Sequence, residues 1–377
     1  MSTSELGRKA PAEQAAWAAP KVRYLILGVL VGCALSIPCV EIVLRLLGEH
    51  TTSNLVGLYQ PFGRNGYKLS PNFRGDTNQL VGRFSVLTND LGLRCGKNSR
   101  RSGTAEGAKG ILVLGASQVY GDGLNYEDSL VGHLASLAGE RGLAVNNAGV
   151  GGHYLENQFE LTQWLYDRGV RPTHIIVLLD PYLIATAGSY NQAYVGSDGV
   201  LYEKESASRH RLTFWLKRHT VTYARVRNAI IRLQPNPKTD LTSAVVRLYS
   251  KAEEDGYRER TLQFLKHLSA WCDERHIAIM LVYDPGVVEF TFDPVVRLGR
   301  SAGVDVDRNV PYRAASSAAA SLSIPFQDSR PAIERESLNG QPLALWDGWH
   351  YSAPVSATVA RSIWEGITSA PSRVDVH

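Results

Sequence analysis

Four short segments rich in apolar residues alternate with stretches of helical periodicity along this chain. The segments are Ile111–Leu114, Leu143–Asn147, Ile175–Leu179 and Ile277–Tyr283. Short runs of this kind are typical of strands in a parallel sheet that helices cover on both faces. The leucines of Asp128–Ala138 show the helical spacing expected between two such strands. The alternation therefore predicts an α/β fold, a three-layer α/β/α sandwich with right-handed crossovers.

Further helices are predicted at Leu155–Tyr166, around Leu262–Trp271 and around Pro354–Ile367, and a last short strand at Ser323–Phe326. Residues 181–250 interrupt the alternation, so we expect an insertion there. The segment is rich in tyrosine and glycine at first and then basic. The basic stretch is interpreted either as the solvated face of a helix or as a contact with a membrane surface or an anionic polymer.

The N-terminal region predicts a membrane anchor. Residues 1–20 are alanine-rich and polar, and are expected to form a disordered cytoplasmic tail. An uncharged run from Tyr24 to Val40 spans about 26 Å as a helix, and apolar sequence continues to Leu47, which is enough for a hydrocarbon core of ~30 Å. A single transmembrane helix is therefore predicted over residues 21–47. More basic residues precede the run than follow it, which places the N-terminus in the cytoplasm.

Two alternatives to an uncleaved anchor were considered. A cleaved signal peptide would need a small-x-small site followed by polar sequence, and the chain has none. Leu30–Cys33 resembles a lipoprotein cleavage box, but apolar sequence continues beyond it. Residues 48–109 are then expected to form a lead-in with short strands such as Arg83–Leu87, and residues 110–377 the main domain.

Composition excludes several classes of protein. The net charge of +4 is small, and no zinc-finger or RNA-binding signature is present, so no nucleic-acid partner is expected. The cysteines at 33, 39, 95 and 272 have no metal-binding spacing, and at most Cys95 and Cys272 could form a disulfide. The glycines at 149, 151 and 152 do not make a dinucleotide-binding pattern. Neither a metal nor a cofactor is predicted.

Two separated motifs carry the reactive groups. Gly115-Ala116-Ser117 follows the first buried strand, where a tight turn can hold a nucleophile clear of the backbone. Asp347 and His350 lie near the C-terminus and can supply a general base and the group that orients it. The loops that follow parallel strands meet at one edge of a sheet. The order and the placement suggest a serine hydrolase.

The motifs together resemble those of SGNH/GDSL-type hydrolases, a superfamily of flavodoxin-like ester hydrolases, in a membrane-anchored bacterial form. Thr88–Arg94 matches an N-x-x-G-[FL]-R lead-in, and Gly115–Ser117 stands where that family has Gly-Asp-Ser, followed by Tyr120–Gly123. Asn147–Gly152 matches the second block and Asp347–His350 the last. The resemblance covers about residues 85–180 and 340–365.

The resemblance implies a role for each matching residue. Ser117 would be the nucleophile, His350 the base that takes its proton, and Asp347 the group that orients the imidazole. The backbone N–H groups of Ser117 and Gly152 would stabilise the oxyanion. It also implies an extracytoplasmic serine esterase of the bacterial inner membrane, acting on acetyl or related esters of carbohydrate or cell-envelope material.

The sequence departs from the family pattern at two positions. Ala116 replaces the Asp before the serine, which removes no proton-transfer group. In the third block, an Asn that donates to the oxyanion is replaced by Leu179, followed by Asp180. An ionised Asp has no donor, and loss of one such donor costs about 2.7–4 kcal/mol in a protease. Asn157 and Asn191 are the candidate substitutes.

Other interpretations stay open. Ser117 could cap the helix that follows it. A polysaccharide O-acetyltransferase could use the same triad, because water and a sugar hydroxyl can both attack one acyl-enzyme. A catalytically impaired relative that binds glycans is the third possibility.

Overall fold

The structure of the chain is a computed structural model. It describes residues 24, 27–28, 31–32, 35–47, 55–63, 66–79, 82–97, 110–191, 193–196, 199, 201–202, 216, 219–233, 243–345 and 349–369. The chain divides into two compact units. One comprises Met1–Thr52 and Leu212–Ile230, and the other Ser53–Arg211 and Ile231–His377.

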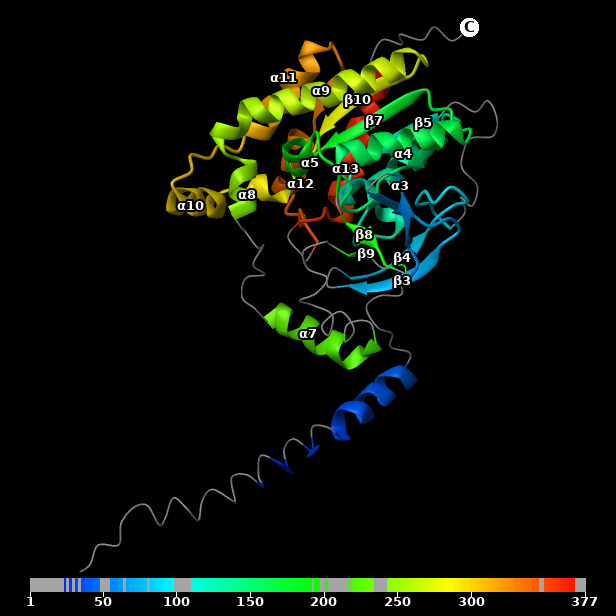
Figure 1. The fold of residues 1–377 in the computed structure, drawn as a ribbon, viewed down its shortest axis with the longest axis vertical. Helices are drawn as coiled ribbons and strands as arrows, with labels where there is room; N and C mark the ends of the chain where they lie inside the picture. Colours follow the sequence, from blue (N-terminus) through cyan, green and yellow to red (C-terminus); the bar gives the residue numbers. More distant parts are fainter. Residues whose placement is uncertain are drawn as a thin grey trace, which may run out of the picture. The chain divides into compact units, whose positions relative to one another are not determined.

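The larger unit is built on a five-stranded parallel sheet (Figure 1). Its strands are β5 (Gly110–Leu114), β6 (Ala144–Asn147), β7 (His174–Leu179), β10 (Ala278–Tyr283) and β11 (Phe326–Asp328). Their spatial order is β11-β10-β7-β5-β6. Numbered along the chain this is the order 2-1-3-4-5 of flavodoxin-like folds, in which the switch point lies between the first and third strands, here β5 and β7. The predicted α/β fold with a parallel sheet is confirmed.

One face of the sheet is covered by α3 (Leu130–Gly139) and α13 (Ala353–Ser369). Alternate residues of a strand point to opposite faces, and Ile111 and Val113 of β5 belong to the hydrophobic cluster on this face. All five residues of β5 are buried, as is typical of a central strand with a helical layer on each side.

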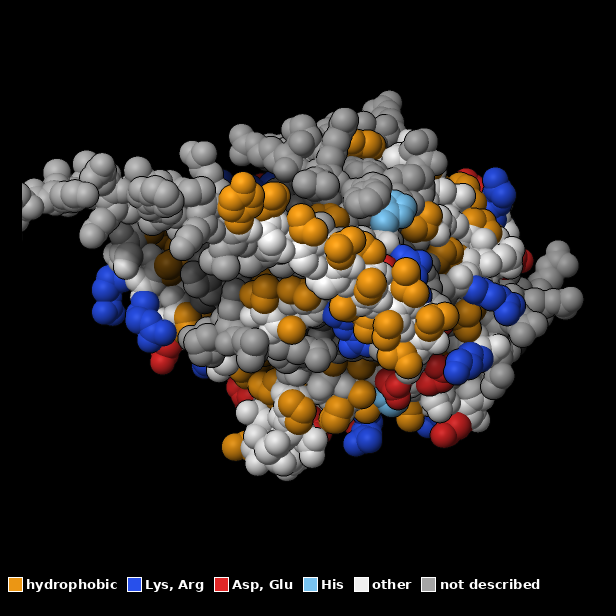
Figure 2. Space-filling model, turned by 90° about the horizontal axis from the view of Figure 1, so that it is seen from below, with side chains coloured by type: hydrophobic (Ala, Val, Ile, Leu, Met, Phe, Trp, Pro, Cys, Tyr) orange, Lys and Arg blue, Asp and Glu red, His pale blue; other side chains and the backbone are white. Residues whose placement is uncertain are grey.

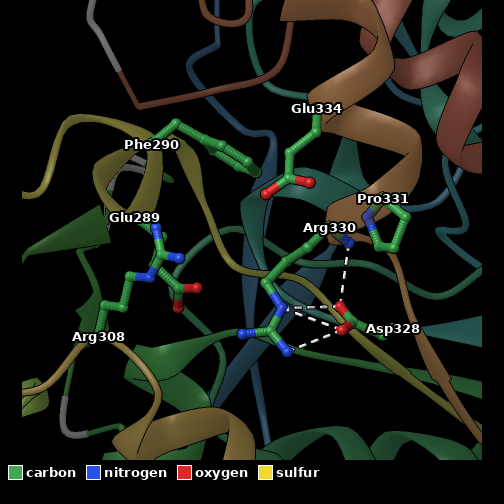
Figure 3. Close-up of a pocket in the computed structure, with 7 residues that line it drawn as sticks. All are labelled: Glu289, Phe290, Arg308, Asp328, Arg330, Pro331 and Glu334. Carbon is green, nitrogen blue, oxygen red and sulfur yellow. Dashed lines mark hydrogen bonds and ion pairs between the residues drawn. The ribbon is translucent and has the colours of Figure 1, made fainter.

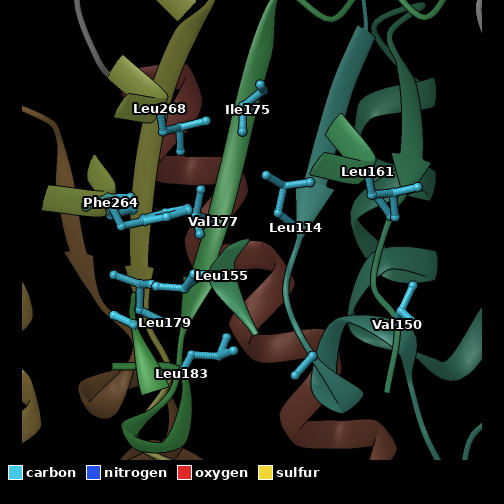
Figure 4. Close-up of a cluster of buried hydrophobic side chains, with 14 of the residues drawn as sticks. Leu114, Val150, Leu155, Leu161, Ile175, Val177, Leu179, Leu183, Phe264 and Leu268 are labelled. Carbon is cyan, nitrogen blue, oxygen red and sulfur yellow. The ribbon is translucent and has the colours of Figure 1, made fainter. Parts of the chain in front are cut away.

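The other face is covered by α4 (Leu155–Asp167), α9 (Glu254–Asp273) and α11 (Val310–Ser321). Leu112 and Leu114 of β5 pack there, in the cluster that Figure 4 shows around Val177 and Phe264 of neighbouring elements. The alanines of α11 are buried against the long helix α9, since small side chains let two helices approach closely.

Two antiparallel hairpins form the lead-in to this sheet. They are β1 (Tyr59–Phe62) with β2 (Gly66–Leu69), and β3 (Arg74–Gln79) with β4 (Gly82–Leu87). The short strand expected at Arg83–Leu87 is therefore confirmed.

The predicted strands and helices of the main domain are present, and their ends move by a few residues except at α9. That helix begins at Glu254, well before the expected Leu262. The last strand, β11, begins at Phe326 rather than Ser323, because Ser323 adopts a positive φ of 54° where the chain leaves α11. The helices α10 (Asp293–Ala302), α11 and α12 (Arg330–Leu338) were not predicted.

The segment predicted as an insertion contains short elements. They are α5 (Pro181–Thr186), β8 (Tyr194–Val195), β9 (Leu201–Tyr202), α7 (Val221–Leu233) and α8 (Ser243–Leu248). Cys95 and Cys272 are free, so the disulfide considered for them is not formed.

The membrane anchor expected over residues 21–47 gains no support from the described helix. No helix in the described part of the chain combines the length and the apolar composition that crossing a bilayer requires.

The Thr88–Arg94 motif forms a tight turn in the lead-in. The Asn89 side chain accepts hydrogen bonds from the N–H groups of Leu91 and Leu93, at 3.0 and 2.9 Å. Gly92 has φ 81°, and a Cβ there would lie 2.2 Å from the Leu69 carbonyl oxygen. Only glycine fits this position, because the conformation and the contact both exclude a side chain.

The same motif ends in Arg94, whose side chain is almost wholly buried. Its guanidinium donates hydrogen bonds to the carbonyl oxygens of Tyr120, Gly121 and Leu124, and to that of Ser85. Three of these carbonyls belong to the loop that follows Ser117. Arg94 thus fixes the lead-in to the loop beside the predicted nucleophile.

Replacement of this buried guanidinium should destabilise the larger unit. Arg94→Met keeps a long side chain but leaves the carbonyl oxygens without donors, and each such loss costs about 1–3 kcal/mol. We expect the free energy of unfolding to fall by roughly 3 kcal/mol in urea denaturation. The matched control is Arg297→Met at an exposed position, where the change should stay within about 0.5 kcal/mol. Equal effects of the two substitutions would contradict this role for Arg94.

Candidate functional site

The predicted nucleophile lies at the carboxyl edge of the sheet, directly after β5. Ser117 is the first residue of the short helix α2 (Ser117–Tyr120), and Ala116 occupies the N-cap position. The interpretation of Ser117 as a helix cap is therefore wrong. Gly115 makes the turn possible, since a Cβ there would lie 2.2 Å from a methyl group of Val119.

Gln118 joins this turn to the loop that carries His350. Its side-chain Nε2 donates a hydrogen bond to the Trp349 carbonyl oxygen at 3.1 Å. Its Oε1 accepts one from the Tyr351 N–H at 3.2 Å. Gln118, the residue next to Ser117, is therefore hydrogen-bonded to the backbone on both sides of His350. Gln118 was not among the predicted site residues, although its place beside the serine was the available signal.

His350 is mostly buried and faces an acidic side chain of the α2 loop. Its Nε2 lies 3.9 Å from a carboxylate oxygen of Asp122, which is longer than a hydrogen bond. The Ser117 hydroxyl makes no hydrogen bond within the described residues, so the structure does not join it directly to His350. Such bonds are often long without substrate and tighten in the substrate complex. Asp347 lies outside the described residues.

The second loop presents Gly152 in a left-handed conformation, with φ 78°. The Tyr67 hydroxyl donates to the Gly151 carbonyl oxygen at 2.8 Å, and a Cβ on Gly152 would lie 2.8 Å from that hydroxyl. The backbone N–H groups of Gly152 and Ser117 donate no hydrogen bond within the described part of the chain. Two free N–H groups are thus available at the loops where the oxyanion site was predicted.

The two candidate substitute amides differ in what they bind. Asn191 donates from Nδ2 to the Gly152 carbonyl oxygen, and so holds that loop. The buried Asn157 accepts at Oδ1 from the N–H groups of Tyr154 and Asn191, at 3.3 and 2.9 Å. Its Nδ2 is buried without a hydrogen-bond partner among the described residues, and lies where a Cβ on Gly66 would be 2.9 Å away.

Two aspartates occupy equivalent places at the ends of neighbouring strands. Leu179 of β7 pairs with Tyr283 of β10, so Asp180 and Asp284 lie side by side at the carboxyl edge. The Asp284 carboxylate accepts from the Tyr351 hydroxyl, and its Oδ2 is buried without a hydrogen-bond partner. Burial raises the pKa of Asp284. Burial and the charge of Asp284 raise the pKa of Asp180 to about 7.

A separate pocket of about 290 Å³ lies beyond these aspartates, near the ends of β10 and β11 (Figure 3). Its lining residues are Glu289, Phe290, Arg308, Asp328, Arg330, Pro331 and Glu334. Arg330 is held by Asp328 at 2.7 Å, and burial raises the pKa of Glu289 to about 8. None of the predicted reactive residues lines this pocket.

Within the described residues, no group of three or more His, Cys, Asp or Glu side chains is arranged to hold a metal ion. The groups at the carboxyl edge of the sheet suit acyl transfer through a serine. They are the Ser117 hydroxyl, the His350 imidazole and two free backbone N–H groups.

Loss of the Gln118 contacts should slow the reaction of Ser117 with a fluorophosphonate. Gln118→Ala removes both hydrogen bonds to the His350 loop, and a displacement of about 1 Å can cost roughly 100-fold in rate. We expect labelling to slow by about 10- to 100-fold, with the unfolding midpoint little changed. Gln118→Glu retains the acceptor for Tyr351 and should give an intermediate rate. An unchanged labelling rate in Gln118→Ala would contradict the positioning role.

Comparisons with known proteins give only structural similarities. No family model and no curated protein matches the sequence. A member of the lipolytic G-D-S-L family from Veillonella parvula is 11% identical, with a TM-score of 0.39 over 70% of this chain and 100% of that one. An α/β hydrolase from the metagenome of Lake Arreo, Spain, is 13% identical, with a TM-score of 0.38 over 71% and 99%. An acetyl xylan esterase variant from Geobacillus stearothermophilus is 15% identical, with a TM-score of 0.37 over 72% and 99%. At such values, the chemistry of this chain has to be inferred from its own residues.

Proposed function

We propose that this chain is a serine ester hydrolase in which Ser117 is the nucleophile and His350 the general base. The observation that carries the proposal is the pair of hydrogen bonds from Gln118 to the residues on either side of His350. They bring the only histidine of the C-terminal motif to the turn that holds the serine. The free N–H groups of Ser117 and Gly152 add the donors that a tetrahedral oxyanion needs.

In the proposed reaction, Ser117 Oγ attacks the ester carbonyl carbon while His350 takes the hydroxyl proton. The N–H groups of Ser117 and Gly152 bind the carbonyl oxygen as it becomes an oxyanion. The intermediate collapses to an acyl-serine, and the alcohol leaves with the proton from His350. Water then attacks the acyl-serine by the same steps and releases the carboxylic acid.

Two carboxylates could assist His350 in this scheme. We assign the orienting role to Asp347, as the resemblance to SGNH/GDSL hydrolases implies. Asp122 faces Nε2, the nitrogen on the opposite side of the ring from Nδ1, and would add only favourable charge for the imidazolium. For the substrate, we propose acetyl or similar small acyl esters on carbohydrate or cell-envelope material.

The hydrolase proposal predicts turnover of a nitrophenyl acetate by the purified chain. Ser117→Ala should abolish it, and Asp347→Asn should lower kcat by up to about 10⁴-fold, as the loss of a triad aspartate does in a protease. Asp122→Asn serves as the matched carboxylate control, with an effect of about tenfold or less expected. A folded wild-type chain that releases no more nitrophenol than Ser117→Ala, and takes up no fluorophosphonate, would refute the proposal.

We further propose that the smaller unit attaches the chain to a bacterial inner membrane. The described residues of its N-terminal helix expose large apolar side chains, among them Leu35 at 66%, Leu46 at 81% and Leu47 at 74%. Figure 2 draws hydrophobic side chains in orange, and many of them are exposed in that view. Exposed apolar surface of this extent suits a lipid environment better than water.

Within this unit the apolar helix is tied to α7. The Glu41 carboxylate accepts hydrogen bonds from the N–H groups of Val221 and Thr222, at 3.0 and 2.9 Å. Arg45 pairs with Glu41 at 2.8 Å and donates to the His219 carbonyl oxygen. The arrangement supports a role of both segments in one membrane-attached unit.

The proposed topology predicts where a C-terminal reporter works. Alkaline phosphatase fused after His377 should be active in bacterial cells, because the larger unit would lie outside the cytoplasm. The matched control is a fusion after Pro20, ahead of the apolar run, which should be inactive. Activity of the control fusion alone would reverse the proposed orientation, and inactivity of both would refute export.

A further inference from the structure

We propose that Asp180 is held as a neutral carboxylic acid and donates its O–H to the oxyanion, in place of the asparagine amide found in SGNH/GDSL hydrolases. The inference rests on the proposed hydrolase function and deepens it, since it names the third donor of the same site. It assigns a catalytic role to a residue that, as a carboxylate, would repel the oxyanion.

The strand register places Asp180 and the nucleophile just beyond the ends of two neighbouring strands. Leu114 of β5 pairs with Val177 of β7, and Ser117 and Asp180 each lie three residues beyond this pair. The two strands also enclose the switch point of the sheet, where ligands of open α/β folds bind. A carbonyl group attacked by Ser117 would therefore stand between the ends of β5 and β7.

The Asp180 side chain caps the helix α5 and is only partly covered. Its Oδ1 accepts a hydrogen bond from the Leu183 N–H at 2.7 Å, and the Tyr182 N–H also interacts with the carboxyl group. When the group is neutral and Oδ1 accepts from Leu183, the proton is carried on Oδ2. In the proposed site, that O–H is the donor to the oxyanion.

The groups around Asp180 favour the neutral form. Asp284 is its neighbour at the end of β10, and the burial of both carboxyl groups together with their mutual repulsion disfavours two negative charges. His350 and the N–H groups of α5 act in the opposite direction, and the buried Tyr249 is the other titratable side chain that interacts with Asp180. Burial and repulsion prevail, since the pKa of Asp180 is raised to about 7.

A neutral aspartic acid can replace an asparagine as a hydrogen-bond donor, because the two groups have the same shape. Ketosteroid isomerase uses a protonated aspartate in its oxyanion hole. The substitution has one consequence that an amide does not share. The donor is lost when the carboxyl group ionises, so hydrolysis should weaken at alkaline pH although His350 is then fully able to accept a proton.

The test compares the pH dependence of kcat/KM for a nitrophenyl acetate, with Ser117→Ala as the blank. In the wild-type protein, kcat/KM should fall above about pH 7, by up to about 100-fold near pH 9, where about one carboxyl group in a hundred remains protonated. Asp180→Asn keeps the N-cap acceptor and supplies a permanent donor, so its alkaline fall should disappear. Asp180→Ala removes the donor and should lower kcat/KM by about 10²- to 10³-fold at about pH 6, with a deficit that shrinks near pH 9, where the wild type has lost the same donor.

A second measurement separates this inference from the hydrolase proposal. The infrared difference spectrum of the wild type minus Asp180→Asn should show the carbonyl band of a neutral carboxyl group at about pH 6, and this band should decline by about pH 9; subtraction removes the bands of other protonated groups such as Glu289. Absence of the band from this difference spectrum, or an alkaline fall retained in folded Asp180→Asn, would overturn the inference. If the band is present but the wild type is no more active than Ser117→Ala, the hydrolase proposal fails and the donor role fails with it, while the neutral state of Asp180 stands as measured.

Discussion

The parallel alignment of the five central strands is the constraint on which the site depends. It sends every strand-end loop to the same edge, so that Ser117, Asp180 and Asp284 each follow the end of one of three neighbouring strands. The switch in strand order between β5 and β7 then leaves room at that edge for a ligand. Helices cover both faces of the sheet, and the hydrophobic packing on each side of β5 keeps the strands in this alignment.

The alignment alone does not fix the loops, and polar side chains complete the arrangement. Arg94 donates hydrogen bonds to carbonyl oxygens at the end of α2 and in the loop that follows it. Gln118 forms hydrogen bonds with the backbone of the C-terminal loop, and Tyr67 donates one to the loop of Gly152. Each side chain makes hydrogen bonds to backbone, so the loops are held in place whatever their own sequences contribute.

Much of the fold follows from the sequence, because fully apolar strands and the helices between them have distinct periodicities. The register of β5 and β7, and thus the nearness of Ser117 to Asp180, could not be predicted, since it depends on contacts between distant segments. Gln118 was missed for the same reason: its partners lie more than 230 positions away. Helix α11 was missed because its buried face is made of alanines, which give little hydrophobic contrast along the chain.

The neighbouring Asp284 changes what the replacement of the expected asparagine by Asp180 implies for the site. From the sequence, Asp180 is a carboxylate that would oppose an oxyanion. In the structure, the carboxyl groups of Asp180 and Asp284 lie side by side and are desolvated, so that both being ionised is unfavourable. Tyr351, next to His350, donates to Asp284 and thereby links the acid pair to the base. The protonation states of Asp180, Asp284 and His350 are therefore coupled, and a change at any one of them alters both the base and the proposed donor.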